Sequence, residues 1–267
     1  MNETNIDIAF RIAKTQGRPA LLTYIVAGDR NKKMTTSILK SINSHVDICE
    51  VGIPHNTSVA DGKQIQNSIY RALKGKIKLK DVFEIVKEYK KDLYSKPVIL
   101  MGYYNMVLQY GEKSFLKKCK EIDVDGIILV DLPFPENKEF AEQCKKNGIT
   151  FIQLLAPTTS DKRLKEIIKN SHSMLYYISM LSTTGGKLKV SSKQILKNYF
   201  KIKKIDERKN IVIGFGITNK TIKSLKKADG VVVGSEICKE ITSSIERGKN
   251  PVIRVNKIVK SLRDKIE

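Results

Sequence analysis

The stretch Asp47-Ile-Cys-Glu-Val-Gly-Ile-Pro-His-Asn-Thr-Ser-Val-Ala-Asp-Gly62 is typical of a short apolar strand followed by a tight turn and a polar loop. Glu50 lies inside the strand, where its apolar neighbours cannot solvate a charge, and Asp61 lies at the far end of the loop. A carboxylate in such a strand is costly unless a partner or a proton neutralises it. Glu50 is therefore either a buried group with a structural partner or a catalytic group, and this stretch leaves both interpretations open.

Seven further apolar segments of strand length surround this stretch, at 20–26, 97–103, 126–130, 150–155, 175–178, 211–213 and 230–233. Helical spacing is expected over 32–44, 63–73, 80–91, 112–121, 136–146 and 160–169, and after Asn219. Continuous apolar strands that alternate with helices predict a parallel sheet covered on both faces. Eight such units in 267 residues favour an α/β fold with a closed (β/α)8 TIM barrel over an open sheet.

Two further expectations concern the limits of this barrel. Apolar residues recur at helical spacing over residues 4–16, which predicts an extra N-terminal helix before the first strand. No linker rich in Pro, Gly or Ser divides the chain, so residues 1–267 are expected to form a single TIM-barrel domain.

Composition narrows the class of protein. The N-terminus lacks a signal-peptide pattern and no apolar run approaches the roughly 18 residues of a membrane span, so a soluble, cytoplasmic protein is expected. The formal net charge is +21, but the lysines are spread from Lys14 to Lys265 without a tract, which favours a solvated basic surface over nucleic-acid binding. Metal sites and disulfides are not expected, because no CxxC pair or His cluster accompanies the four cysteines, Cys49, Cys119, Cys144 and Cys238.

Chemistry in such barrels is carried at the carboxyl ends of the strands. That rule selects Glu50 and Asp61, and it selects the glycine turns Gly214-Phe-Gly216 and Gly234-Ser235. Glycine lets backbone N–H groups approach an anion closely, and the turns after the last two strands commonly hold a phosphate. The residues therefore predict proton-transfer or lyase chemistry on a small phosphorylated substrate.

Motifs along nearly the whole chain resemble, in the same order, those of the tryptophan synthase alpha subunit. They are Tyr24 with Ala-Gly-Asp29, Glu50 to Gln66, Leu-Met-Gly-Tyr-Tyr-Asn105, Val-Asp-Gly126 through Asp131-Leu-Pro133, Leu-Ala-Pro-Thr158, Tyr-Tyr-Ile-Ser179, Thr-Thr-Gly185, Gly-Phe-Gly-Ile217 and Asp-Gly-Val-Val-Val-Gly-Ser235. The resemblance implies a lyase of tryptophan biosynthesis, which cleaves indole-3-glycerol phosphate to indole and glyceraldehyde 3-phosphate in a retro-aldol reaction.

The resemblance also implies roles for single residues. Glu50 matches the acid–base group, Asp61 the carboxylate that binds the indole N–H, Tyr176 the hydroxyl that supports the catalytic Glu, and Thr184 a loop threonine that orders Asp61. The expected phosphate-binding residues are Gly185, Gly216, Gly234 and Ser235, and the expected indole-pocket residues are Tyr24, Tyr103 and Leu129. No metal or organic cofactor is implied for this subunit. The implied partner is a pyridoxal-phosphate-dependent beta subunit, in an α2β2 assembly that passes indole through a tunnel.

The chain departs from the family pattern at three places. His55-Asn-Thr-Ser58 replaces Phe-Ser-Asp-Pro, Lys63 replaces a Pro, and Ser182 replaces a Gly. The 55–58 segment belongs to a loop that touches the beta subunit in the family, and the loss of Pro at 63 loosens the chain around Asp61. His45, His55 and His172 have no evident partner and are expected to be solvated side chains.

Three alternatives stay open at this point. One is a catalytically weakened alpha subunit that mainly binds and activates the beta subunit, as the altered 55–58 loop suggests. Another is a different phosphate-binding barrel enzyme, such as an isomerase or epimerase. Nucleic-acid binding is the third, and the positive charge is its only support.

Overall fold

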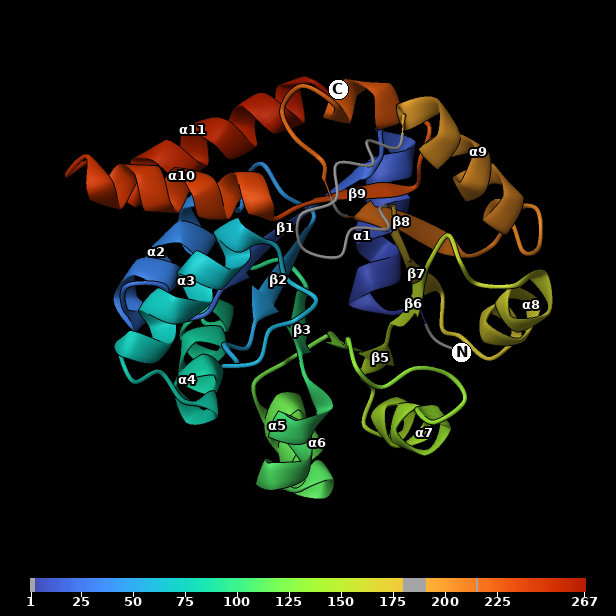
Figure 1. Ribbon diagram of the computed structural model, residues 1–267, viewed down its shortest axis with the longest axis horizontal. Coiled ribbons are helices and arrows are strands. Elements are labelled where there is room, and N and C mark those ends of the chain that lie inside the picture. The colour runs from blue at the N-terminus through green and yellow to red at the C-terminus, as the bar shows by residue number, and fades with distance from the viewer. Residues whose placement is uncertain (1–2, 180–190, 215) are drawn as a thin grey trace.

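The computed structural model describes residues 3–179, 191–214 and 216–267, in which a ring of parallel strands is surrounded by helices (Figure 1). The strands are β1 (Ala20–Val26), β2 (Ile48–Gly52), β3 (Val98–Gly102), β4 (Gly126–Leu129), β5 (Thr150–Phe151), β6 (Gln153–Leu155), β7 (Met174–Ile178), β8 (Asn210–Gly214) and β9 (Gly230–Val233). All of the pairs between neighbouring strands are parallel, as the apolar segments predicted.

The order of the strands closes the sheet into a barrel. It runs β5-β4-β3-β2-β1-β9-β8-β7-β6, so the two strands at its ends are the two halves of one segment, 150–155, separated only by Ile152. The first half pairs with β4 and the second half pairs with β7. The segment therefore occupies one position in the ring, and the predicted eight-position barrel is confirmed.

The helices follow the strands as predicted, with three differences. The described helices are α1 (Asn5–Thr15), α2 (Lys32–Ile42), α3 (Lys63–Lys74), α4 (Leu79–Lys90), α5 (Tyr104–Tyr110), α6 (Glu112–Glu121), α7 (Lys138–Lys146), α8 (Asp161–Lys169), α9 (Ser192–Lys203), α10 (Ser235–Glu246) and α11 (Pro251–Asp264). Helix α5 was not expected, and α9 to α11 lie in segments that the prediction left unassigned. The prediction of a helix after Asn219 is wrong, because only a 3-10 turn, η1 (Ile222–Leu225), forms there.

The predicted N-terminal helix covers the amino-terminal end of the barrel. Its buried residues belong to the same apolar cluster as the inward-facing strand residues. Ile6 and Phe10 lie against glycines that begin two strands: a Cβ on Gly126 would be 3.0 Å from Ile6 Cδ1, and a Cβ on Gly230 would be 2.9 Å from Phe10 Cε1. Because α1 fills this end, the opposite end is the one left for a ligand.

The strand residues divide between two apolar layers. Inward-facing residues such as Ile99, Ile128 and Val212 form the barrel interior with α1, and their sequence neighbours pack outward against the helices. Glu50 belongs to the inward-facing set, because it pairs in register with Tyr24 on one side and Ile99 on the other. No helix of the described ranges is long and apolar enough to cross a membrane.

Candidate active site

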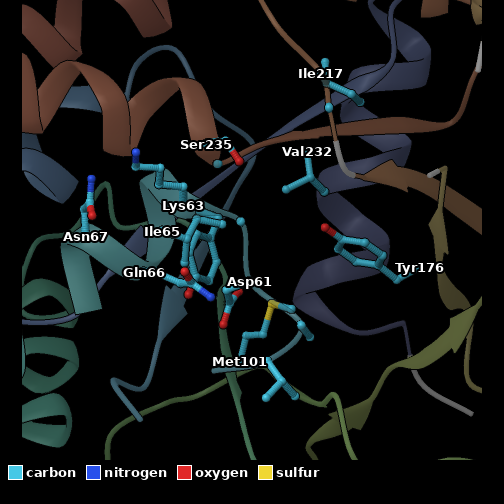
Figure 2. A pocket seen from close by; sticks show the side chains of 16 residues that line it. Asp61, Lys63, Ile65, Gln66, Asn67, Met101, Tyr176, Ile217, Val232 and Ser235 are labelled. Atoms are coloured by element: carbon cyan, nitrogen blue, oxygen red, sulfur yellow. The ribbon is translucent and has the colours of Figure 1, made fainter. Parts of the chain in front are cut away.

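A cavity of about 660 Å³ opens at the carboxyl ends of the strands (Figure 2). Its wall is built by residues of β1, β3, β7 and β9, by the loops after β2 and β8, and by the first turns of α3 and α10. The cavity therefore lies at the end of the barrel that the sequence selected, opposite to α1.

Glu50 lies on β2 inside the barrel and is fully buried. Neither of its carboxylate oxygens has a hydrogen-bond partner within the described ranges. Burial alone raises the pKa of Glu50 to about 8, so the group is mostly protonated at neutral pH. Its side chain is not part of the cavity wall, but its register neighbour Tyr24 is. A buried carboxyl group without a partner is unusual in a folded protein and is typical of a group kept for chemistry.

Asp61 lines the cavity from the loop after β2. Burial raises its pKa to about 6, and a hydrogen bond from the Tyr103 hydroxyl, 3.4 Å from Oδ2, acts in the opposite direction. The same hydroxyl accepts a hydrogen bond of 3.2 Å from the backbone N–H of Ala60. Tyr103 is therefore linked to Asp61 and to the chain beside it, and Asp61 is mostly ionised at neutral pH.

His55 supports this arrangement, although a solvated side chain was expected for it. Its ring stacks on Tyr103 with the centroids 4.9 Å apart and an interplanar angle of 25°. Its Nδ1 accepts a hydrogen bond of 3.2 Å from the backbone N–H of Thr57. The side chain that replaces the usual Phe thus keeps an aromatic contact with the residue that hydrogen-bonds Asp61.

Tyr24 and Tyr176 stand inside the mouth of the barrel, each over a glycine. A Cβ on Gly52 would overlap the Tyr24 hydroxyl, and a Cβ on Gly214 would overlap the Tyr176 hydroxyl, so each glycine makes room for a ring. Burial, followed by the charges of Glu50 and Asp61, raises the pKa of Tyr176 well above its usual value. Tyr176 therefore lies within the electrostatic reach of both carboxylates, and Figure 2 shows it across the cavity from Ile65.

The end of the cavity beside α10 suits an anion. Gly216, Gly234 and Ser235 all line the cavity, and Ser235 is the first residue of α10. The N-cap residue Gly234 offers no side chain to the free N–H groups of this helix. Such a helix start combines unpaired donors with the positive end of the helix dipole. Three of the four expected phosphate-binding residues thus line the same cavity.

Among the expected residues that the structure describes, Tyr103 and Leu129, like Glu50, do not line the cavity. Leu129 belongs to the outer layer between the strands and the helices, and its inward-facing neighbour is Ile128. The assignment of Leu129 to an indole pocket therefore does not fit its position. Thr184 and Gly185 lie outside the described residues, as does Ser182.

Several cavity residues were missed by the sequence analysis, including Ile65, Met101 and Val232. They are ordinary apolar residues of a helix or strand, so nothing in their type distinguishes them from the core. Lys63 was noted as a departure from the family pattern and also lines the cavity. In the described part of the chain, no three His, Cys, Asp or Glu side chains come together as metal ligands would.

Comparisons with known proteins agree with this geometry. A family model described as "Tryptophan synthase alpha chain" matches residues 10–267. A tryptophan synthase alpha chain of Pelagibacter ubique is 65% identical over 98% of both chains. The crystal structure of a tryptophan synthase alpha chain from Legionella pneumophila superposes with a TM-score of 0.89 at 32% identity, covering 99% of this chain and 98% of that one.

One similar structure comes from an assembly. A chain in the crystal structure of a tryptophan synthase complex from Pyrococcus furiosus is 37% identical, with a TM-score of 0.82, and the match covers 92% of this chain and 98% of that one. The family model spans the chain from the middle of α1 to its end, and this range includes every element that contributes to the cavity.

Proposed function

The chain belongs to the tryptophan synthase alpha chain family, and from that premise we propose that its cavity cleaves indole-3-glycerol phosphate to indole and glyceraldehyde 3-phosphate. The observation that carries the proposal is Glu50, a fully buried carboxyl group with a pKa of about 8 and no hydrogen-bond partner among the described residues. Such a group can both give and take a proton near neutral pH.

Glu50 is proposed to act twice in one turnover. The neutral carboxyl group gives its proton to the ring carbon C3, which leaves a positive charge on the ring. The resulting carboxylate takes the proton of the glycerol hydroxyl while the bond between C3 and the glycerol chain breaks. The electron pair of that bond neutralises the ring, and the former hydroxyl carbon becomes the aldehyde. Glu50 ends each cycle protonated, so one residue with a raised pKa is sufficient for both transfers.

Asp61 is proposed to stabilise the charge on the ring. Its pKa of about 6 leaves it mostly anionic at neutral pH, and it lines the cavity, so it can accept the hydrogen bond of the indole N–H. The N–H becomes more acidic when C3 is protonated, which strengthens this bond in the transition state. Tyr176 is proposed to support Glu50, and Tyr24 to line the indole pocket.

The phosphate is proposed to bind at the start of α10. The free N–H groups after Gly234 and the turn at Gly216 supply the donors. Fixing the phosphate there places the rest of the substrate in the barrel mouth, between Asp61 and Tyr176, where the reacting bond needs to be. Thr184 and Gly185 stay predictions of the sequence for this site.

The partner is proposed to be a tryptophan synthase beta subunit in an α2β2 assembly, to which the indole passes. A similar chain in a tryptophan synthase complex supports this part. Pyridoxal phosphate is expected only in the beta subunit, and this subunit is proposed to work without an organic cofactor or a metal. The cytoplasmic location expected from the sequence stays a prediction.

The proposal is tested by indole release from indole-3-glycerol phosphate, measured for the purified chain alone and after mixing with a beta subunit. We expect slow release alone and faster release in the complex. Activation of the beta subunit without any indole release would instead indicate the catalytically weakened subunit. Turnover of a different sugar phosphate, with none of the indole substrate, would indicate another class of barrel enzyme.

A further inference from the structure

The charges that face the cavity are few. Among the described residues that line it, Asp61 is the one acidic side chain and Lys63 is the one basic side chain. Glu50 lies deeper and is mostly protonated at neutral pH because of its raised pKa. A phosphorylated substrate brings up to two negative charges into this space, so Lys63 is the side chain that can oppose them.

The ammonium group of Lys63 is available to bind a negatively charged ligand. Within residues 3–179, 191–214 and 216–267, its ammonium group makes no hydrogen bond and no ion pair, and the side chain is exposed. By contrast, Arg71 on the same helix is engaged: its Nε and Nη2 atoms lie 2.7 and 2.8 Å from the two carboxylate oxygens of Asp29. The charge of Arg71 is therefore neutralised locally, whereas the charge of Lys63 is available to a ligand.

The position of Lys63 relates it to the anion end of the cavity. It is the first residue of α3, and α3 packs against α10, whose first residue is Ser235. Figure 2 shows Lys63 and Ser235 on the same side of the cavity. Both helices begin after a glycine, Gly62 or Gly234, that gives no side-chain cap, so neither N-cap residue occupies the first N–H groups of its helix.

We propose that Lys63 is a substrate-binding residue of this chain, which holds the phosphate of the substrate by its positive charge together with the start of α10. The proposal rests on the proposed function for the identity of the substrate. It also gives a physical meaning to a departure from the family pattern, in which a Pro usually occupies this position. A lysine there replaces a rigid residue by a mobile cation on a four-carbon stem, which suits a ligand that must enter and leave.

The alternative is that Lys63 is one more solvated lysine on a protein with a formal net charge of +21. In that case its removal would weaken anion binding only by reducing the general positive field. Lys74 provides the matched control, because it lies at the opposite end of α3, is exposed, and changes the net charge by the same amount when replaced.

The experiment measures the affinity of the full-length chain for glycerol 3-phosphate by calorimetry, in the wild type and in Lys63→Gln, Lys63→Arg and Lys74→Gln. We expect Lys63→Gln to weaken binding about tenfold, the scale of one charge-assisted hydrogen bond. Lys63→Arg should stay within about threefold of the wild type, and Lys74→Gln should be nearly unchanged. Raising the salt concentration should weaken the wild type more steeply than Lys63→Gln.

Measuring the turnover of indole-3-glycerol phosphate distinguishes a failure of this inference from a failure of the proposed function. If the wild type cleaves indole-3-glycerol phosphate, Lys63→Gln should raise KM about tenfold and leave kcat within about twofold, because the lost contact is made equally in ground and transition states. Equal effects of Lys63→Gln and Lys74→Gln on phosphate affinity would overturn the proposal, as would Lys63→Arg binding as weakly as Lys63→Gln. An absence of turnover with Lys63-dependent phosphate binding would contradict only the proposed function.

Discussion

Glu50 and Asp61 are two carboxyl groups whose surroundings give them different charges at the same pH. Complete burial without a partner raises the pKa of Glu50 to about 8, whereas Asp61, which receives a hydrogen bond from Tyr103, reaches only about 6. Between these two values the first group is mostly an acid and the second mostly an anion. This separation is what the proposed reaction requires, because one residue must donate a proton and the other must stabilise positive charge.

The raised pKa of Glu50 predicts how stability depends on pH. From about pH 4.5 to about pH 8 the unfolded chain has lost this proton while the folded chain keeps it, so the free energy of unfolding falls as the pH rises. Glu50→Gln removes the effect, and the stability difference between variant and wild type should grow by up to about 1.4 kcal/mol per pH unit in that window. Urea unfolding at pH 5, 6.5 and 8 measures it, and parallel curves for the two proteins would show that Glu50 is not desolvated.

The hydrogen bond from Tyr103 leads to a prediction about the pKa of Asp61. Tyr103→Phe removes the hydroxyl that lowers the pKa of Asp61, so that pKa should rise and the acid limb of kcat/KM should move to higher pH. The loss of kcat/KM at neutral pH should be about threefold to tenfold. Tyr104→Phe is the control, because that hydroxyl donates to Glu112, away from the cavity. An acid limb that stays in place in Tyr103→Phe would contradict the assignment of this limb to Asp61.

The candidate residues that lie toward the carboxyl end of the barrel are those whose type is unusual at their position. A Glu in an apolar strand and a Gly-Ser pair at a strand end can be recognised from the sequence. The structure brings Glu50, Asp61, Gly234 and Ser235 to one end of the barrel. Leu129 was misplaced because Gly126-Ile-Ile-Leu129 is apolar on both faces. In such a strand the alternation of side chains carries no signal, so inward and outward residues cannot be separated without coordinates.

At the scale of elements, α1 decides which end of the barrel can hold a ligand. Its apolar face continues the inward-facing layer of the strands and fills the amino-terminal end. Its start is fixed by a capping box, in which the Thr4 side chain accepts from the Asp7 N–H and the Asp7 side chain accepts from the Thr4 N–H. The helix is thus a structural part of the barrel.

Phe10 tests this role of α1. Phe10→Ala should lower the free energy of unfolding by about 3–5 kcal/mol, because the ring is buried and the glycine beside it cannot fill the space that is left. Ile12→Ala on the same helix should change stability by no more than about 0.5 kcal/mol, since Ile12 is 45% exposed. Chemical unfolding of both variants measures the difference. Equal, small effects would mean that α1 is only loosely attached.

The strands were predictable from sequence and some helices were not. Most residues of the ring strands are apolar and lie in short runs, which is a strong signal. Helix α5 follows β3 almost directly and buries only Val107, so it lacks the periodic apolar face that reveals a helix. After Asn219 the segment packs Ile222 and Leu225 three residues apart, which a single 3-10 turn satisfies without a longer helix.

At the scale of the whole molecule, the helix that stabilises the barrel and the cavity proposed for catalysis lie at opposite ends of the barrel. The amino-terminal end is filled by α1, while the carboxyl end leaves a cavity lined by Asp61 and by the starts of two helices whose N-cap glycines give no side-chain cap. A substrate with a phosphate at one end and an aromatic ring at the other matches this polarity. Basic residues spread over the chain add a positive field that attracts such an anion without being part of the site.

The most direct test of the central claim is the rate of indole release from indole-3-glycerol phosphate by the wild type and by Glu50→Gln, measured side by side with the beta subunit present. Because Gln is nearly isosteric but can neither give nor take the proton, we predict a loss of about 10²–10⁴-fold in kcat with the fold preserved by circular dichroism. Indole release by Glu50→Gln at the wild-type rate would contradict the account.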